Sequence, residues 1–165
     1  MEKPRRKFKT KIAQIEFSPM PFWDTSALVK LYVRERDSDR FVAMARKSGT
    51  RATISQLSIH EMRCALHRKE FAHAIPPNMA ELAYRELRRD VEDGVLKLIP
   101  YGQDVALEFD RVVRICYQAR PVVPIRALDG LLLASALTAR MPDLVSTDLR
   151  MRDAGVLLGL GVFPI

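Results

Sequence analysis

The segment Phe22–Ala27 decides the fold; it reads Phe-Trp-Asp-Thr-Ser-Ala. An apolar pair ends at an acidic residue, and two hydroxyl residues follow directly. This is the pattern of a buried strand that delivers a carboxylate at its tip and then enters a helix capped by Thr25 or Ser26. We therefore predict a strand over 21–24 and a helix over 26–33.

The same change from apolar to polar sequence occurs at three other acidic residues. Leu144–Asp148 reads Leu-Val-Ser-Thr-Asp, a second strand that ends close to an acid. Glu61 lies just inside a helix that follows an extended segment, and Asp129 opens a helix that is almost wholly apolar. Acids at strand ends and helix starts are the arrangement that a shared divalent-metal pocket needs.

Helical and strand periodicities alternate along the chain. Further helices are predicted over 36–47, 56–70, 76–90, 103–119, 127–140 and 148–158, and further strands over 51–55, 95–100, 144–146 and 162–163. Such alternation favours an α/β fold, with a central parallel sheet of four to five strands and helices on both faces. Ligands of such sheets bind at the carboxyl ends of the strands, so we expect the four acids to converge there.

Length and composition are those of a single globular domain. The chain has 165 residues, 48% of them hydrophobic, which is enough for one core. Cys64 and Cys116 lack the spacing of zinc ligands or of a disulfide framework, so a reducing, cytoplasmic location is expected. No apolar run has the length of a signal peptide or a membrane span, and we therefore expect no contact with membranes.

The N-terminal residues 1–19 form a basic arm, and the domain proper is assigned to 20–165. The arm carries six basic residues against two acidic ones. Three interpretations stay open: a contact with a polyanion such as RNA, a disordered solvated tail, or an upstream extension, since Met20 offers an alternative start.

Clustered carboxylates without a counter-ion repel one another, which raises their pKa values and lowers stability. A divalent cation removes that cost. Ligation by oxygen alone selects a hard ion, Mg²⁺ or Mn²⁺. The chemistry that follows from such a site is phosphodiester hydrolysis by a metal-activated water, without a side-chain nucleophile.

Four motifs in this sequence resemble those of the PIN domain, and within it the ribonuclease toxins of VapC type. The first is the strand and helix over 22–32, which contains Asp24, and Glu61 corresponds to the second. The third is Ile125–Ala136, around Asp129, and the fourth is Leu144–Met151, around Asp148. The resemblance covers nearly all of the chain from Met20 onward.

The resemblance implies an Mg²⁺- or Mn²⁺-dependent endoribonuclease that forms homodimers and is inhibited by a cognate antitoxin. It makes Asp24, Glu61, Asp129 and Asp148 the catalytic metal ligands, with Ser26, Ser146 and Asp153 as accessory candidates. The third motif departs from the family's pattern, because Gly130 and Leu132 stand where many members have Ala and His. This departure concerns substrate handling rather than the metal ligands.

Each acid also has a purely structural interpretation. Asp24, Asp129 and Asp148 suit helix caps or the positive end of a helix dipole, and Glu61 suits an ion pair with Arg63 or Arg68. Arg126 is open between substrate phosphate, an acid of the site and the surface, whereas Lys30 and Arg34 are assigned to the RNA backbone.

Two other functions are alternatives to the nuclease. One is a PIN-like scaffold without activity that binds RNA or a protein partner; the intact set of acids favours the nuclease. The other is a phosphatase with two acids separated by one residue. The residue two positions after Asp24 is Ser26, which argues against the phosphatase.

Overall fold

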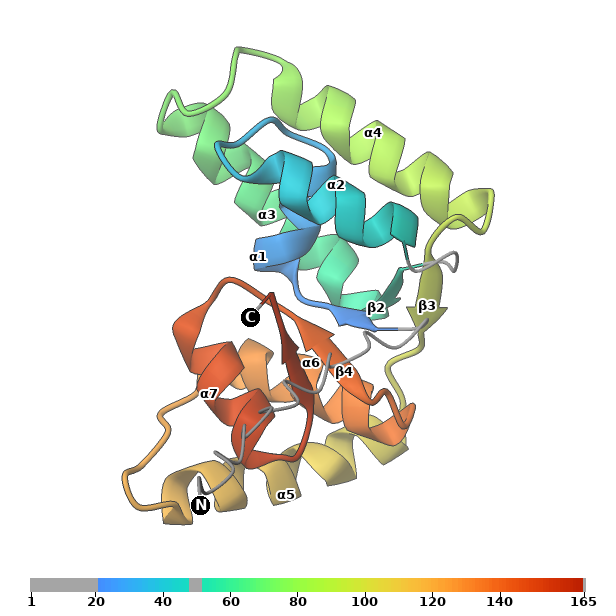
Figure 1. Ribbon diagram of the computed structural model, residues 1–165. Coiled ribbons are helices and arrows are strands. Elements are labelled where there is room, and N and C mark those ends of the chain that lie inside the picture. Colours follow the sequence, from blue (N-terminus) through green and yellow to red (C-terminus); the bar gives the residue numbers. More distant parts are fainter. Residues whose placement is uncertain (1–20, 48–51, 165) are drawn as a thin grey trace, which may run out of the picture.

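Five short strands form one parallel sheet at the centre of the computed structural model, which describes residues 21–47 and 52–164 (Figure 1). The strands are β1 (Phe22–Trp23), β2 (Thr53–Ser55), β3 (Lys97–Ile99), β4 (Asp143–Val145) and β5 (Gly161–Phe163). Their order across the sheet is β3-β2-β1-β4-β5, and every neighbouring pair is parallel. The predicted parallel α/β fold is confirmed.

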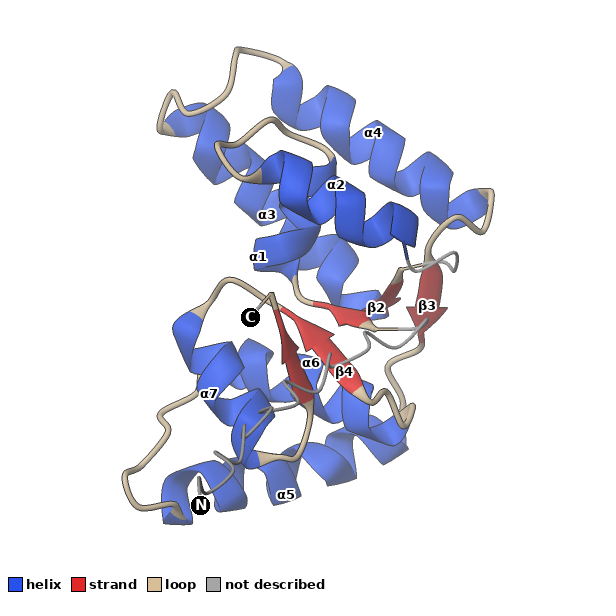
Figure 2. Cartoon of the chain, in the orientation of Figure 1, coloured by secondary structure: helices blue, strands red, loops and turns tan. Residues whose placement is uncertain are grey.

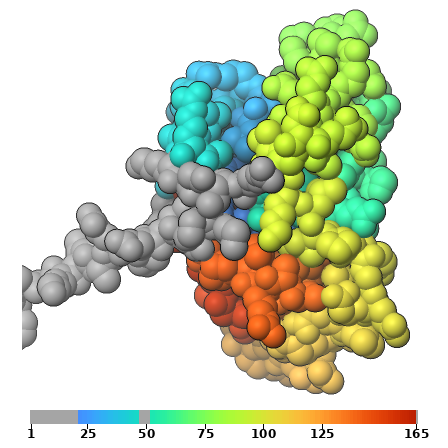
Figure 3. Space-filling model, turned by 90° about the vertical axis from the view of Figure 1, so that its right-hand side faces the viewer, coloured from blue at the N-terminus to red at the C-terminus, as the bar shows by residue number. Residues whose placement is uncertain are grey.

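The helices cover both faces of this sheet (Figure 2). One face carries α1 (Thr25–Leu28), the 3-10 turn η1 (Val29–Leu31), α2 (Ser38–Lys47), α3 (Gln56–Phe71) and α4 (Met79–Glu92). The other face carries α5 (Gln103–Gln118), α6 (Ala127–Thr138) and α7 (Leu149–Leu157). In the space-filling view the blue-to-green N-terminal half lies directly against the yellow-to-red C-terminal half (Figure 3).

Alternation along the central strands divides the core into two layers. Phe22 of β1 and Leu144 of β4 pack with α5, α6 and α7. The next residues, Trp23 and Val145, pack with the opposite layer of helices. All four side chains are fully buried, which is why these strands read as continuous apolar runs and not as an alternation of apolar and polar residues.

The sheet reverses its strand order beside β1. The chain runs from β1 outward through β2 to β3, and then returns to place β4 on the other side of β1. The crevice at such a switch point is where open parallel sheets bind their ligands. Asp24 directly follows β1 and Ser146 directly follows β4, so both lie at this crevice.

Two predicted helices differ from the observed ones. In place of the helix expected over 26–33, the chain forms the short helix α1, which tightens into η1. Lys30 of η1 binds Glu35 and Asp37 at 2.5 and 2.8 Å, so the following loop turns back toward η1. The helix expected from Pro76 begins at Met79, because the preceding residue Asn78 has a left-handed conformation (φ 65°) that helical geometry does not allow.

The prediction for residues 1–19 lies outside the described part of the chain. No helix in the described part is long and apolar enough to cross a membrane.

Candidate active site

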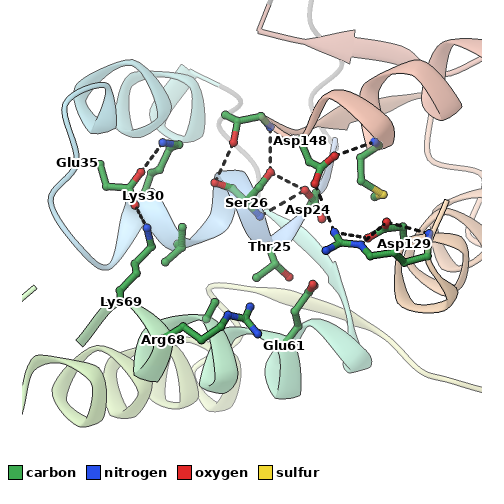
Figure 4. Close-up of a pocket in the computed structure, with 15 residues that line it drawn as sticks. Asp24, Thr25, Ser26, Lys30, Glu35, Glu61, Arg68, Lys69, Asp129 and Asp148 are labelled. Carbon is green, nitrogen blue, oxygen red and sulfur yellow. Dashed lines mark hydrogen bonds and ion pairs between the residues drawn. The ribbon is translucent and has the colours of Figure 1, made fainter. Parts of the chain in front are cut away.

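A cavity of about 290 Å³ opens at the carboxyl ends of the central strands (Figure 4). All four predicted acids line it, brought there by four different elements: Asp24 follows β1, Glu61 lies on α3, Asp129 lies on α6 and Asp148 precedes α7. Their convergence is therefore a consequence of the parallel topology, because the residues are far apart in the sequence.

Asp24 is held rigidly at the base of this cavity. Three donors reach the same carboxylate oxygen, Oδ2: the Ser26 hydroxyl at 2.6 Å, the Ser146 hydroxyl at 2.8 Å and the Ser26 backbone N–H at 3.3 Å. The last bond makes Asp24 the N-cap of α1, so its capping role is real. None of these three bonds uses Oδ1, so capping leaves that oxygen available to a ligand.

Ser26 and Ser146 connect the first and fourth motifs across the crevice. Their hydroxyl oxygens lie 3.2 Å apart, and the Ser26 hydroxyl also accepts the Thr147 backbone N–H at 2.9 Å. The Ser146 hydroxyl accepts the Asp148 backbone N–H at 3.1 Å. Both serines predicted as accessory residues therefore position acids of the cavity.

Asp129 is almost completely buried, and Arg126 neutralises it. The guanidinium contacts both carboxylate oxygens, with Nε 2.9 Å from Oδ2 and Nη2 3.0 Å from Oδ1. The Arg126 backbone N–H also donates to Oδ2, which is one half of a capping box at the start of α6. The other half is absent, because an arginine side chain has no acceptor.

Asp148 combines a capping role with a contact to the cavity. Its Oδ1 accepts the backbone N–H groups of Arg150 and Met151 and so begins α7. Its Oδ2 lies 3.4 Å from Nη2 of Arg126, the same nitrogen that contacts Asp129. One arginine thus bridges the third and fourth motifs.

Glu61 is the acid with the least compensation. Its Oε2 is buried and has no hydrogen-bond partner of ordinary geometry among the described residues. Arg63 pairs instead with Glu81 at 3.1 Å, so the ion pair considered for Glu61 does not form with that residue. Burial raises the pKa of the Glu61 carboxyl, and the negative charges of Asp24 and Asp129 raise it further, which outweighs the opposing effects of the Thr25 hydroxyl and of Arg126. A cation in the cavity would reverse this effect.

Burial also raises the pKa of Asp24, although its bonds from Ser26 and Ser146 oppose the rise. Two of the four acids therefore lie in surroundings that disfavour their ionised forms. Such perturbed carboxyl groups in a cleft are typical of functional sites.

The two basic residues predicted to contact RNA already have acidic partners. Lys30 lines the cavity but is nearly buried against Glu35 and Asp37, and the exposed Arg34 pairs with Asp39 at 2.9 Å, so their contact with RNA stays a prediction. Lys69 also pairs with Glu35.

Arg68 lines the cavity as well, and its side chain reaches from α3 toward Glu61 (Figure 4). A second cavity of about 680 Å³ lies beside the first and shares Glu61, Arg68, Arg126 and Asp129 with it. Arg68 is exposed, so it is available to a polyanion at the mouth of both cavities.

Other residues of the site could not be assigned from their motifs. Thr25 lines the cavity with a buried hydroxyl that has no hydrogen bond of ordinary geometry within the described residues, yet its position beside Glu61 lowers the pKa of that carboxyl. Beneath the cavity the Ser55 and Ser135 hydroxyls meet at 3.0 Å and join the start of α3 to α6. Asp153, the third accessory candidate, is exposed on α7 and is not among the residues lining the cavity.

The departures within the third motif have a packing explanation. A methyl group on Gly130 would come within 2.8 Å of the Phe109 ring, so α5 leaves no room for alanine here without a shift. Leu132 is fully buried in the core between the sheet and α6. Both positions therefore belong to the contact of α6 with its neighbours rather than to the cavity.

The residues present fit a divalent cation in their chemistry. The donors that the four acids offer are oxygens, and one of them, Glu61 Oε2, has no hydrogen-bond partner in the described part of the chain. In the described part of the chain, however, no three acid, histidine or cysteine side chains are close enough together to hold a metal as they stand. A cation could therefore be held by three or more of them only if some side chains moved.

Two solved structures have a similar fold and define the class as α/β proteins of this topology. The crystal structure of FitAcB from Neisseria gonorrhoeae gives a TM-score of 0.62 at 16% sequence identity, covering 88% of this chain and 96% of that chain. The structure of VapBC2 from Rickettsia felis bound to a DNA fragment from their promoter gives 0.59 at 13%, covering 87% and 97%. Identities this low show the fold alone.

The family follows from the sequence. The PIN domain family matches residues 22–157, and the chain belongs to this family. Its membership identifies it as a nuclease and confirms the resemblance that the four acidic motifs predicted. No curated protein matches the chain.

Proposed function

We propose that this nuclease is an endoribonuclease that hydrolyses RNA phosphodiester bonds with Mg²⁺ or Mn²⁺. The observation that supports the proposal best is Glu61, a half-buried acid whose buried Oε2 lacks a hydrogen-bond partner among the described residues and which faces three other acids across one cavity. A carboxylate oxygen that is buried without a partner lowers the stability of the fold. A bound cation would remove that cost.

In this proposal Asp24, Glu61, Asp129 and Asp148 hold the metal. The Asp24 carboxylate is positioned by the Ser26 and Ser146 hydroxyls, and the Asp148 backbone by Ser146, so both residues are held at the cavity before a cation arrives. A bound Mg²⁺ or Mn²⁺ would supply an activated water and stabilise the leaving oxygen. The exposed Arg68 guanidinium beside the cavity would bind a phosphate of the RNA backbone.

We further propose that the protein is the toxin of a toxin–antitoxin pair. The motif resemblance to toxins of VapC type supports this proposal, and one of the two similar solved structures is that of VapBC2. A small antitoxin encoded as its partner, a cytoplasmic location and a homodimeric state are the corresponding expectations for this chain. They rest on the motif resemblance and on this similar structure.

The test is removal of the metal. Purified protein incubated with total RNA is expected to cleave in Mg²⁺ or Mn²⁺ and to lose all cleavage in EDTA, with activity returning when metal is restored. Sequencing of the new ends would give the cleavage sites. Equal cleavage in EDTA would overturn the metal-dependent mechanism. Absence of both cleavage and metal binding would favour a binding scaffold instead.

Arg68 gives a separate prediction about RNA binding. Replacing Arg68 with glutamine is expected to weaken binding of single-stranded RNA in EDTA, and to reduce the slope of log K against log salt by about 0.7. One lost phosphate contact has this effect whatever the RNA sequence. Fluorescence anisotropy over a series of salt concentrations measures it. Arg114→Gln, which removes the same charge from an exposed position on α5, is the control, and an equal change there would contradict a specific contact.

A further inference from the structure

Arg126 occupies both oxygens of the most buried acid in the cavity. It is the N-cap residue of α6, and its side chain folds back over the first turn. Nε and Nη2 form parallel bonds of 2.9 and 3.0 Å to Oδ2 and Oδ1 of Asp129. Bidentate pairs between arginine and a carboxylate are among the stronger polar contacts in proteins.

The same guanidinium lies between two of the acids. Nη2 is also 3.4 Å from Oδ2 of Asp148, and Arg126 lines both the acid cavity and the larger cavity beside it. A single positive charge therefore lies where the third and fourth motifs face each other. It supplies the neutralisation that a cation would otherwise give.

Arg126 is free to leave this position without disturbing the core. Its side chain is 57% exposed, whereas that of Asp129 is 4% exposed. The backbone N–H of Arg126 bonds Asp129 at 3.2 Å independently of the guanidinium, so the start of α6 is preserved when the side chain swings outward. Only the two side-chain contacts to the acids are lost.

A guanidinium and a divalent cation compete for these carboxylates. Both are positive and repel each other at contact distance, and the guanidinium already takes up an acceptor position on each oxygen of Asp129. This competition also explains why no three acids in the described residues are arranged for a metal, because the arginine holds Asp129 and Asp148 in its own geometry.

We propose that Arg126 is an internal counter-ion which a divalent cation must displace from Asp129 and Asp148, and that this exchange sets the metal affinity of the protein. The inference rests on the metal centre of the proposed function. Arg126 is thus a positioning residue. Before the cation binds, its guanidinium holds Asp129 and Asp148 in place by ion pairing, and afterwards it moves to the mouth of the two cavities.

The first test is a titration with Mn²⁺, followed by calorimetry, of the wild-type protein and Arg126→Gln. The variant is expected to bind Mn²⁺ roughly threefold to tenfold more tightly, because no ion pair has to be broken first. Arg126→Lys keeps the charge but loses the bidentate contact, so its affinity is expected to lie between the two.

The matched control is Arg111→Gln. Arg111 makes the same kind of pair with an acid three residues away, Glu108, but lies on α5 outside both cavities. The change in net charge is identical. An equal gain in Mn²⁺ affinity in this control would show a general charge effect and would overturn the role of Arg126.

A second readout follows the wild-type protein itself during the titration, and a variant serves only to assign the signal. The side-chain Nε–H resonance of Arg126, assigned by its absence from Arg126→Lys, is expected to shift as Mg²⁺ is added and to reach saturation together with metal binding. A resonance that stays unchanged while Mg²⁺ binds would overturn the exchange.

The outcomes separate the two proposals. Tight Mn²⁺ binding that is equal in wild type and Arg126→Gln would reject the exchange and leave the metal-dependent nuclease standing. Failure of both proteins to bind Mn²⁺ would reject the metal centre and the exchange together. Tighter binding by Arg126→Gln, with a metal-dependent shift of the Arg126 signal, supports both.

Discussion

Asp24→Asn is expected to abolish metal-dependent RNA cleavage, with a loss of at least about 10²–10³-fold, while the protein remains folded. The substitution removes the charge and replaces one carboxylate oxygen by an amide nitrogen, which does not bind a hard cation. The amide oxygen can still accept the three bonds from Ser26 and Ser146 that now reach Oδ2, so the support of the crevice persists.

The measurement is the rate of cleavage in saturating Mg²⁺, together with urea unfolding in EDTA. Because burial disfavours the charged form of Asp24, the metal-free variant is expected to be at least as stable as wild type. Asp110→Asn, at an exposed position on α5, is the control for loss of one negative charge and is expected to keep full activity. Full activity in Asp24→Asn would refute the assignment of the site.

The strand tips could be predicted because their signals are local. A buried strand that ends in Asp24 and then two hydroxyl residues predicts a carboxylate at the tip of the strand, and Leu144–Asp148 repeats the pattern. Asp24 and Asp148 each cap a helix with one carboxylate oxygen, and a cap of this kind does not by itself exclude a ligand role for the other oxygen.

The long-range contacts could not be predicted in the same way. Lys30 has the spacing of an exposed basic residue, yet Glu35 and Asp37 turn it inward once the helix after β1 ends early. The Ser55–Ser135 pair joins residues 80 positions apart, and nothing in either local segment indicates it. Such contacts follow from the arrangement of the elements and not from the periodicity of any one of them.

Arg126 lies between these two cases. Its spacing of three residues from Asp129 permits an ion pair on a helix, which is one of the three roles that the sequence allows for it. What the local sequence does not contain is the second contact, to Asp148, which is 22 residues away. That contact exists because the end of β4, where Asp148 precedes α7, lies at the same edge of the sheet as the start of α6.

Glu61→Gln is expected to have opposite effects on activity and on metal-free stability. Cleavage in Mg²⁺ should fall by about 10²-fold, since a charged ligand is lost. In EDTA at neutral pH the free energy of unfolding should rise by roughly 1–2 kcal/mol, because a buried carboxylate oxygen without partners is replaced by a neutral amide. Saturating Mn²⁺ should reverse the order, because wild type gains more from the metal.

The pH dependence of this difference identifies its cause. The folded protein raises the pKa of Glu61 above its value in the unfolded chain, so the folded state holds the proton more tightly. The contribution of Glu61 to stability therefore falls as pH rises from about 4.5 through the folded pKa, and is lowest above it. Glutamine does not titrate, so the advantage of Glu61→Gln over wild type should be small near pH 4 and should grow to a plateau toward neutral pH.

The control is Glu81→Gln. Glu81 is exposed on α4 and pairs with Arg63, and its substitution should change the free energy of unfolding by no more than about 0.5 kcal/mol. An advantage that stays constant with pH would mean that packing, rather than the buried charge, distinguishes the variant from wild type.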